Sequence, residues 1–310
     1  MSVPGKTRHH PGAAGAGPRH AGFGRAARRL AAGITATGAA AAAYMAFEAQ
    51  WVVCREDELL VPGLPEPWSG LTILHLADVH AGLFPTNERS LAKVVEWAEA
   101  LSPDLVLLAG DILGDPERST RCLDLLARLR PSLGMYAVTG NHEYGLSKGP
   151  LARPRDTTAL WAQVGTTLLS DSCVTLPARQ GTQIVICGAD YVTRGEGLLH
   201  RGEGLDASVA PSFPILLVHE PPPPDSPLTA LFPLAFAGHT HGGQLRVPAR
   251  SGLTPLSKEG TDVLEGVHPW GQGRIVVSRG IGTSFLPFRL FTRPEATLWR
   301  LVYTSCDHPA

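Results

Sequence analysis

The sequence predicts an α/β protein, a four-layer α/β/β/α sandwich preceded by an N-terminal apolar helix. Apolar strand-like runs alternate with helical segments between residues 70 and 139, and short β-rich runs with few helices between them follow. Five of the apolar runs end at Asp, Asn or His side chains. The composition, 310 residues with 44% hydrophobic and 18% charged, suits one globular domain with an extra segment at one end.

The N-terminus is predicted to be a basic tail followed by a membrane or signal segment. Residues 1–29 are rich in Gly, Ala, Pro and His and contain basic but no acidic residues, so we expect them to be disordered. Residues 30–47 are uncharged and, at about 1.5 Å per residue, long enough to cross a bilayer. They are mostly Ala and Gly and would insert weakly.

Two interpretations of residues 30–47 fit this pattern, an uncleaved signal anchor and a cleaved export signal. In either case the positive-inside rule puts the arginines in the cytoplasm and residues 60–310 outside it. The paired Arg28-Arg29 hint at twin-arginine export, although the usual flanking residues are missing. A helix packed on a soluble protein is the remaining interpretation, and the lack of a polar face argues against it. We therefore expect a cell-membrane protein with its main domain outside, or a secreted one.

Residues 48–69 are predicted to be a linker, because they include the Pro/Gly-rich stretch Pro62–Pro67, and residues 70–310 are expected to form the main domain. Asn87 is a plausible N-cap for the first helix of this domain, and Pro103 ends that helix. The first elements expected are strand Leu71–Ala77, helix Asn87–Leu101, strand Leu105–Ala109, helix Glu117–Arg130 and strand Gly134–Thr139.

The second half of the domain is predicted to form a second sheet that packs on the first, with helices outside. Its β-rich runs are Thr167–Ser170, Gln183–Ala189, Phe213–Val218, Leu234–Ala237, Arg274–Ser278 and Ala296–Tyr303.

Charge and cysteine content exclude some functions. Six of the 27 basic residues precede the first acidic residue, Glu48, which leaves 21 against 28 acidic ones in the rest of the chain. A body with a net charge of about −7 is a poor nucleic-acid binder, so no nucleic-acid partner is expected. The five cysteines are an odd number without close pairing, which argues against a zinc knuckle or a disulfide framework. We expect buried thiols, with one bridge compatible with the spacing.

The side chains that end the five apolar runs have metal-binding chemistry. Because strands of a parallel sheet bring their carboxyl ends to one edge, we expect these side chains to meet. A set of nitrogen and oxygen ligands without thiolate suits Mn, Fe or Zn better than Ca or Mg. Glycines flank the ligands, and we expect them where a Cβ would crowd a phosphate-sized ligand. The candidates are Asp78, His80, Asp111, Asn141, His142, His219, His239 and His241.

The order D-x-H, GD, GNH followed by Asp or Glu, H, and GH-x-H resembles that of the calcineurin-like metallophosphoesterase superfamily over about residues 70–303. The resemblance implies two divalent metal ions that activate a hydroxide for in-line attack on phosphorus. It leaves His142 to meet the substrate, where it would stabilise the phosphoryl transition state or protonate the leaving oxygen. The implied ligands are Asp78, His80 and His241 for one ion, Asn141, His219 and His239 for the other, and Asp111 as the bridge.

Differences from the general family pattern indicate which branch of the superfamily the chain resembles. Asp111 is followed by Ile112–Asp115 instead of the D-R-G of protein Ser/Thr phosphatases, so a protein phosphatase is not expected. The stretch Ser278–Ser284, with Pro287, Arg289 and Pro294-Glu295 after it, resembles the bacterial membrane-associated branch related to UDP-2,3-diacylglucosamine hydrolases. Glu143 and Ala77 stand where that branch often has Asp and Ser. Both changes are mild.

The substrate expected is a phosphodiester, with a phospholipid or another envelope diester favoured. Leu83-Phe84 and Phe285–Phe288 could admit an acyl chain or rest on a bilayer, or could simply pack on their own domain. Arg279 and Arg289 could pair with a substrate phosphate or with acidic neighbours. The alternatives are a phosphomonoesterase or nucleotidase, and an inactive envelope-binding module of the same fold. The sequence does not indicate an oligomeric state.

Overall fold

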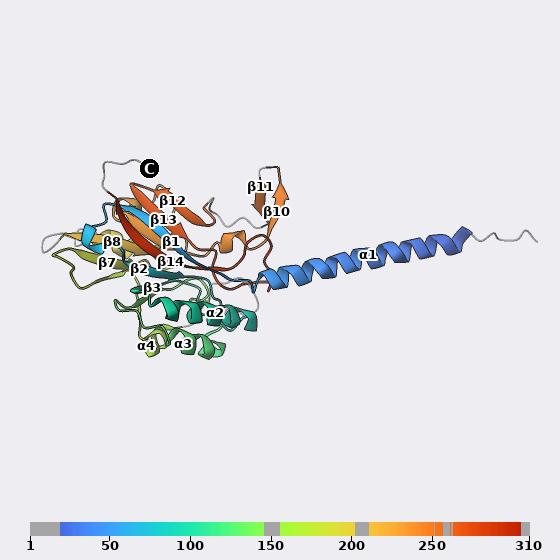
Figure 1. The fold of residues 1–310 in the computed structure, drawn as a ribbon, viewed down its shortest axis with the longest axis horizontal. Coiled ribbons are helices and arrows are strands. Elements are labelled where there is room, and N and C mark those ends of the chain that lie inside the picture. Colours follow the sequence, from blue (N-terminus) through green and yellow to red (C-terminus); the bar gives the residue numbers. More distant parts are fainter. Residues whose placement is uncertain are drawn as a thin grey trace, which may run out of the picture. The chain divides into compact units, whose positions relative to one another are not determined.

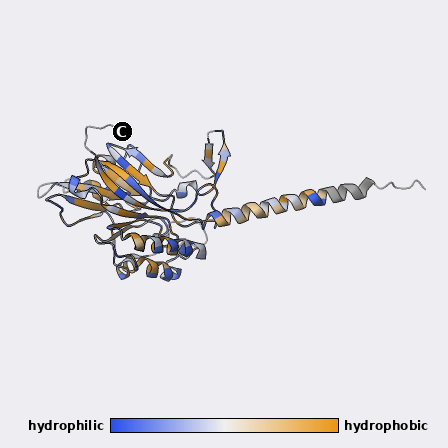
Figure 2. Cartoon of the chain, viewed as in Figure 1, coloured by the Kyte–Doolittle hydropathy of each residue, from blue (hydrophilic) through white to orange (hydrophobic). Residues whose placement is uncertain are grey.

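The computed structural model describes residues 19–145, 156–201, 211–250, 252–256, 261 and 263–304. Its contacts divide the chain into two units, Met1–Tyr44 and Met45–Ala310. Helix α1 (Arg19–Glu48) provides the described part of the first unit and reaches into the second. Its segment Ala27–Glu48 is long and apolar enough to cross a membrane, and it carries pale, weakly hydrophobic colours in Figure 2. Residues 19–29, predicted to be a disordered tail, begin this helix; residues 1–18 lie outside the described part.

The first sheet has six strands in the order β1-β14-β2-β3-β4-β5. Strands β2 to β5 are parallel to one another, β14 is antiparallel to β2, and β1 pairs in parallel with β14 (Figure 1). The strands are β1 (Val53–Pro62), β2 (Thr72–Leu76), β3 (Leu105–Ala109), β4 (Met135–Val138), β5 (Thr166–Leu168) and β14 (Glu295–Thr304).

The second sheet also has six strands, in the order β12-β13-β9-β8-β7-β6, and its four central strands are parallel. A separate hairpin pairs β10 (Arg246–Ala249) with β11 (Gly252–Pro255). The strands of the sheet are β6 (Ser172–Thr175), β7 (Gln183–Gly188), β8 (Ser212–Leu217), β9 (Leu234–Ala237), β12 (Gly266–Trp270) and β13 (Gly273–Val277).

The predicted four layers are present. Apolar side chains of both sheets form one buried core between them, including Leu107 of β3 and Ile215 of β8. A second core lies between the first sheet and helices α2 (Pro85–Leu101), α3 (Thr120–Leu126) and α4 (Thr158–Gln163). The other outer layer is thin, because the second sheet is covered by the short α5 (Glu196–Arg201) and η4 (Pro227–Ala230). Further short 3-10 turns are η1 (Glu66–Trp68), η2 (Pro116–Arg118) and η5 (His241–Gly243).

Several predicted boundaries were wrong. The expected linker contains β1, a ten-residue strand whose buried Leu59 and Val61 join the core between the sheets. Strands β5 and β14 belong to the first sheet, not the second. The helix expected over residues 117–130 is split into η2 and α3. Helix α2 starts at Pro85, so Asn87 is not its N-cap.

A disulfide joins Cys173 of β6 to Cys187 of β7 across an edge of the second sheet. The prediction of buried thiols therefore fails for this pair, which takes the single bridge that the spacing allowed. Cys54 and Cys122 are free thiols. Cys306 lies outside the described residues.

Candidate metal centre

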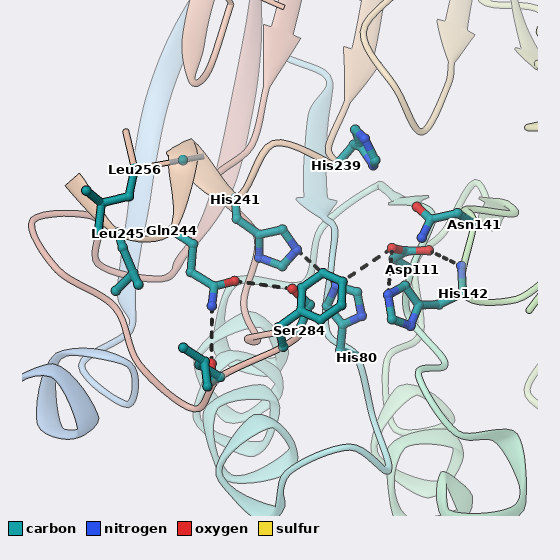
Figure 3. A pocket seen from close by; sticks show the side chains of 13 residues that line it. His80, Asp111, Asn141, His142, His239, His241, Gln244, Leu245, Leu256 and Ser284 are labelled. Carbon is teal, nitrogen blue, oxygen red and sulfur yellow. Dashed lines mark hydrogen bonds and ion pairs between the residues drawn. The ribbon is translucent and has the colours of Figure 1, made fainter. Parts of the chain in front are cut away.

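The candidate ligands come from loops that leave the carboxyl ends of five parallel strands, three in the first sheet and two in the second. Asp78 and His80 follow β2, Asp111 follows β3, and Asn141 follows β4. His219 follows β8, while His239 and His241 follow β9. The structure brings these side chains together, and those of His80, Asp111, Asn141, His239 and His241 line the pocket in Figure 3.

One group of ligand atoms consists of Asp78, His80 and His241, all of them buried. The Nε2 atoms of His80 and His241 lie 2.9 Å apart, and His241 Nε2 lies 3.6 Å from Asp78 Oδ1. The carboxylate of Asp78 is held in place by the backbone N–H of His239, which donates to both of its oxygens.

A second group consists of Asp111, His219 and His239, with Asn141 beside it. His219 Nε2 lies 3.5 Å from Asp111 Oδ2, 3.1 Å from His239 Nδ1 and 3.3 Å from Asn141 Oδ1. The other ring nitrogen of His219 lies 2.8 Å from the carbonyl oxygen of Ala109. In the neutral form of His219 that binds a metal, Nδ1–H donates to that carbonyl and the Nε2 lone pair is directed into the group.

The donor set fits divalent metal ions. Ligand atoms around one tetrahedral ion at 2.0–2.1 Å would lie about 3.4 Å from one another, and the closest pairs in both groups have separations of this order. Carboxylate, amide and imidazole groups, with no thiolate among them, are typical ligands of divalent ions. Asp111 Oδ2 lies between the groups, at 3.7 Å from His80 Nε2 and 3.5 Å from His219 Nε2.

Burial and the charges of neighbouring side chains set the protonation states of the candidate ligands. Burial lowers the pKa of His239 to about 4, helped by the charge of His219. Burial and neighbouring histidines also hold the pKa values of His80 and His241 well below their usual range. Burial alone would lower the pKa of His219, but the adjacent Asp111 carboxylate raises it to about 10. Most of these imidazoles are thus neutral, the form that binds metals.

The backbone is strained at most of the candidate ligands. Five of the candidate ligands have positive φ angles, between 49° and 72°, where side chains other than glycine are uncommon. Each such residue costs on the order of 1–3 kcal/mol, and strain of this kind clusters at functional sites. The five are Asp78, His80, Asp111, His239 and His241.

The flanking glycines make room for the ligands themselves. A Cβ at Gly140 would lie 2.3 Å from Asp111 Oδ1, and one at Gly238 would lie 2.5 Å from Asp78 Oδ2. The expectation that these glycines accommodate a phosphate is therefore corrected, because the nearest atoms are those of the candidate ligands.

A model of the calcineurin-like phosphoesterase family matches residues 71–243 of the chain. The metallophosphoesterase YkuE of Bacillus subtilis is 30% identical over 288 residues, which cover 89% of this chain and 94% of that protein. The chain belongs to the calcineurin-like phosphoesterase family. It is therefore a hydrolase that acts on phosphoric ester bonds, and the resemblance predicted from the motifs is confirmed at the level of the family.

Two further relatives carry more specific names. The phosphodiesterase YaeI of Escherichia coli is 31% identical over 237 residues, covering 74% of this chain and 82% of that protein. A transmembrane protein with a metallophosphoesterase domain from Danio rerio is 31% identical over 253 residues, covering 77% of this chain and 55% of that longer protein.

His142 of this phosphoesterase lies at the pocket, next to the central carboxylate. Its backbone N–H donates to Asp111 Oδ1 at 2.8 Å, and its Nε2 lies 3.9 Å from Asp111 Oδ2. The ring also packs edge-on against His80, with 4.3 Å between ring centroids. His142 is therefore close enough to the ligands to act on a group bound between them.

Glu143 has a role that the sequence analysis missed. Its buried carboxylate accepts the backbone N–H groups of Asp111, Leu113 and Gly140, at 2.8–2.9 Å. It thereby fastens the loop after β3 to the loop after β4. Burial and the charge of Asp111 raise the pKa of Glu143 to about 7. The sequence showed only an acidic residue where the family has one.

The two arginines considered for phosphate binding are both occupied within the protein. Arg279 pairs with Glu295 and Glu265. Arg289 is fully buried and donates to the carbonyl oxygens of Arg279, Gly280, Gly282, His241 and Thr292. These arginines hold the loop that carries Gly280 and Gly282 against the centre.

Two cavities border the centre. The first, of about 330 Å³, is lined on one side by candidate ligands and His142 and on the other by Leu245, Leu256, Phe285 and Leu286. Phe285 and Leu256 are 66% and 64% exposed, so the apolar side is open to solvent. The second, of about 670 Å³, is lined by His219, Tyr191, Arg194 and a run of prolines. Sequence reasoning did not find this second cavity, because its walls come from separate loops.

Proposed function

We propose that the protein is a membrane-anchored or exported phosphodiesterase with two divalent metal ions. One ion is held by Asp78, His80 and His241, the other by Asn141, His219 and His239, and Asp111 bridges them. The observation that carries this assignment is the position of Asp111 Oδ2 between the two groups, 3.7 Å from Nε2 of His80 and 3.5 Å from Nε2 of His219. The mixed nitrogen and oxygen ligands favour Mn, Fe or Zn.

The protein's own groups would position and protonate the substrate. When bound, two such ions supply Lewis-acid activation of water and neutralise charge on a phosphoryl group. His142 lines the same cavity as the ligands, and we assign it the transfer of a proton to the departing ester oxygen or the stabilisation of charge that develops there. Glu143 and Arg289 keep the ligand loops in register through their backbone hydrogen bonds.

A diester with an apolar arm is the substrate class we propose. The solvent-open Phe285 and Leu256, together with Leu286, give the first cavity an apolar wall opposite the ligands, which suits an acyl chain. Leu83 and Phe84, which were considered for the same purpose, are half-buried and lead into α2. The name of the Escherichia coli relative supports a diester over a monoester. The relation to UDP-2,3-diacylglucosamine hydrolases remains a prediction.

Two observations support a location at the membrane and outside the cytoplasm. Helix α1 has a span of sufficient length and hydropathy, preceded by basic residues, which is the pattern of a signal anchor or an export signal. The disulfide between Cys173 and Cys187 is a feature of proteins in oxidising compartments.

The test is the hydrolysis of matched esters by the full chain in detergent, reconstituted in turn with Mn, Fe and Zn. Bis(p-nitrophenyl) phosphate and p-nitrophenyl phosphate share a leaving group and differ in the second ester arm. We expect metal-dependent cleavage that favours the diester.

Faster cleavage of the monoester would instead identify a phosphomonoesterase. No turnover with metals bound would favour a binding module of the same fold.

A further inference from the structure

We propose that four side chains around the end of α1, Phe47, Trp51, Phe291 and Arg293, form an aromatic collar that lies in the headgroup region of a lipid bilayer. The proposal rests on the membrane anchoring proposed above. It adds a contact between lipid and the catalytic unit, Met45–Ala310, and this contact is separate from the helix that would cross the bilayer.

The collar has the exposure and chemistry of a membrane interface. Phe47, Trp51 and Phe291 are 58%, 45% and 45% exposed, which is unusual for large apolar side chains. Phe47 packs on Trp51 with 5.4 Å between ring centroids, and the Arg293 guanidinium lies 3.7 Å above the Trp51 ring. Exposed aromatic rings with a basic group beside them are typical of the zone where a protein leaves the hydrocarbon core.

Phe291 is held outward at a cost to the backbone. Its φ angle is 56°, in the left-handed region that bulky residues rarely adopt. Its neighbour Thr292 is buried and fixed, because its N–H donates to Glu48 Oε1 at 2.7 Å and its hydroxyl donates to the carbonyl oxygen of Gln244 at 2.5 Å. Strain retained in an ordered loop, with the apolar ring left in solvent, indicates that the ring has a partner outside the protein.

The position of the collar along the chain identifies that partner as lipid. The candidate span ends at Glu48, one residue after Phe47 and three before Trp51. The last residues of α1 belong to the catalytic unit, where the carbonyl oxygen of Met45 accepts the N–H of Arg289. Residues that directly follow a membrane span lie at headgroup depth, so the rings of Phe47 and Trp51 lie there, and the hydrogen bond of Thr292 to Glu48 brings Phe291 to the same level.

The loop that carries Phe291 and Arg293 also connects the collar to the candidate active site. Leu290 N–H donates to the carbonyl oxygen of Gln244, a residue that lines the first cavity. Arg289 donates to the carbonyl oxygen of His241, a candidate ligand. A collar resting on lipid would therefore hold the first cavity and its apolar wall near the membrane surface, where a diester embedded in the bilayer can reach it.

The first test locates Trp51 by fluorescence of the full chain in vesicles of phosphatidylcholine and phosphatidylglycerol. Acyl chains brominated near the headgroup quench only tryptophans that approach the bilayer. We expect a quenched component in the wild type that is lost in Trp51→Phe. The other five tryptophans, Trp68, Trp97, Trp161, Trp270 and Trp299, are present in both proteins and should give the same background, so the difference between the two reports Trp51.

Failure of the collar and failure of the anchor give different results. Equal quenching in the wild type and Trp51→Phe, with the chain still floating with the vesicles, would overturn the collar and leave the anchoring intact. A chain that does not float with the vesicles would overturn the anchoring and the collar with it. If the chain still cleaves the soluble diester in either case, the proposed phosphodiesterase activity holds even though the collar or the anchoring has failed.

The second test compares a long-chain phosphodiester in the vesicles with its water-soluble short-chain analogue. Phe47→Ser combined with Phe291→Asn removes two rings, and Asn tolerates the left-handed backbone. The ratio of the vesicle rate to the soluble rate should fall about fivefold, in line with the loss of apolar contact with lipid. The control Leu60→Ser removes an equally exposed apolar side chain of β1 and should leave the ratio unchanged. An equal loss on both substrates would overturn the proposal.

Discussion

His142 and Asp111 are in direct contact, yet we assign them different tasks. The ring of His142 packs against His80, and its Nε2 lies 3.9 Å from Asp111 Oδ2, so the ring borders both groups of ligands. In the assignment above, each ion has its ligands without this ring. Removing the ring should then affect the reaction and spare the metals.

The variant His142→Ala should retain its metal content and lose about 10²–10⁴-fold in kcat, the usual contribution of such a group. Metal content is measured by elemental analysis and kcat with the soluble diester. A variant that loses metal would show that His142 is a ligand.

His75 makes a prediction about stability in acid. It is fully buried in β2 against Phe236, and its Nε2 has no hydrogen-bond partner among the described residues. Burial lowers its pKa from 6.5 to about 3. The unfolded chain therefore takes up this proton at higher pH than the folded one, and folding stability is lost as the pH falls from 6.5 towards 3.

The variant His75→Phe should lose less stability over that range, by at most about 5 kcal/mol, since it has no proton to accept. Urea unfolding of both proteins at a series of pH values measures the difference. Parallel losses in the two proteins would contradict the assignment of this shift to His75.

At the scale of elements, the ligand loops were predictable and their supports were not. Apolar runs followed by Asp, Asn or His located the ends of β2, β3, β4, β8 and β9, because buried parallel strands leave that pattern. Strand β1 was missed, since its consecutive acidic residues Glu56–Glu58 resemble a solvated linker until β14 pairs with it. The second cavity depends on contacts between distant segments, and the disulfide depends on the register of β6 against β7, neither of which a single sequence displays.

A substitution at Glu143 tests whether the hydrogen bonds between the loops after β3 and β4 are needed to hold the metal ligands in place. In Glu143→Gln the amide group cannot accept all three backbone N–H groups. We expect a loss of roughly 1–3 kcal/mol in stability and about a 10–100-fold weaker metal affinity. The control Asp104→Asn disturbs a carboxylate that accepts the N–H and hydroxyl of Thr72, at the start of β2. It should lose stability alone, and an equal loss of metal affinity would show that Glu143 has no special role.

At the scale of the whole molecule, the candidate centre lies where the two sheets meet. Asp78, His80, Asp111 and Asn141 follow strands of the first sheet. The second sheet contributes His219, His239 and His241. Ions bound by both sets of ligands would tie the sheets together and stabilise the folded state over the unfolded one.

Removing the metals should therefore lower the melting temperature. An ion present at a thousand times its dissociation constant contributes about 4 kcal/mol, which corresponds to about 10 °C for a domain of this size. Calorimetry of the full chain in detergent, with and without a chelator, measures the change. An unchanged melting temperature after confirmed metal loss would show that the ions do not link the sheets.

The most direct test of the dinuclear assignment is the metal content of the wild type and Asp111→Asn, measured by elemental analysis after reconstitution. Asn keeps the shape of the side chain but removes the charge and the second carboxylate oxygen that bridging requires. We predict two ions per chain in the wild type and fewer than one in the variant, with loss of diester cleavage. Two ions retained by Asp111→Asn would contradict the bridging role and the account built on it.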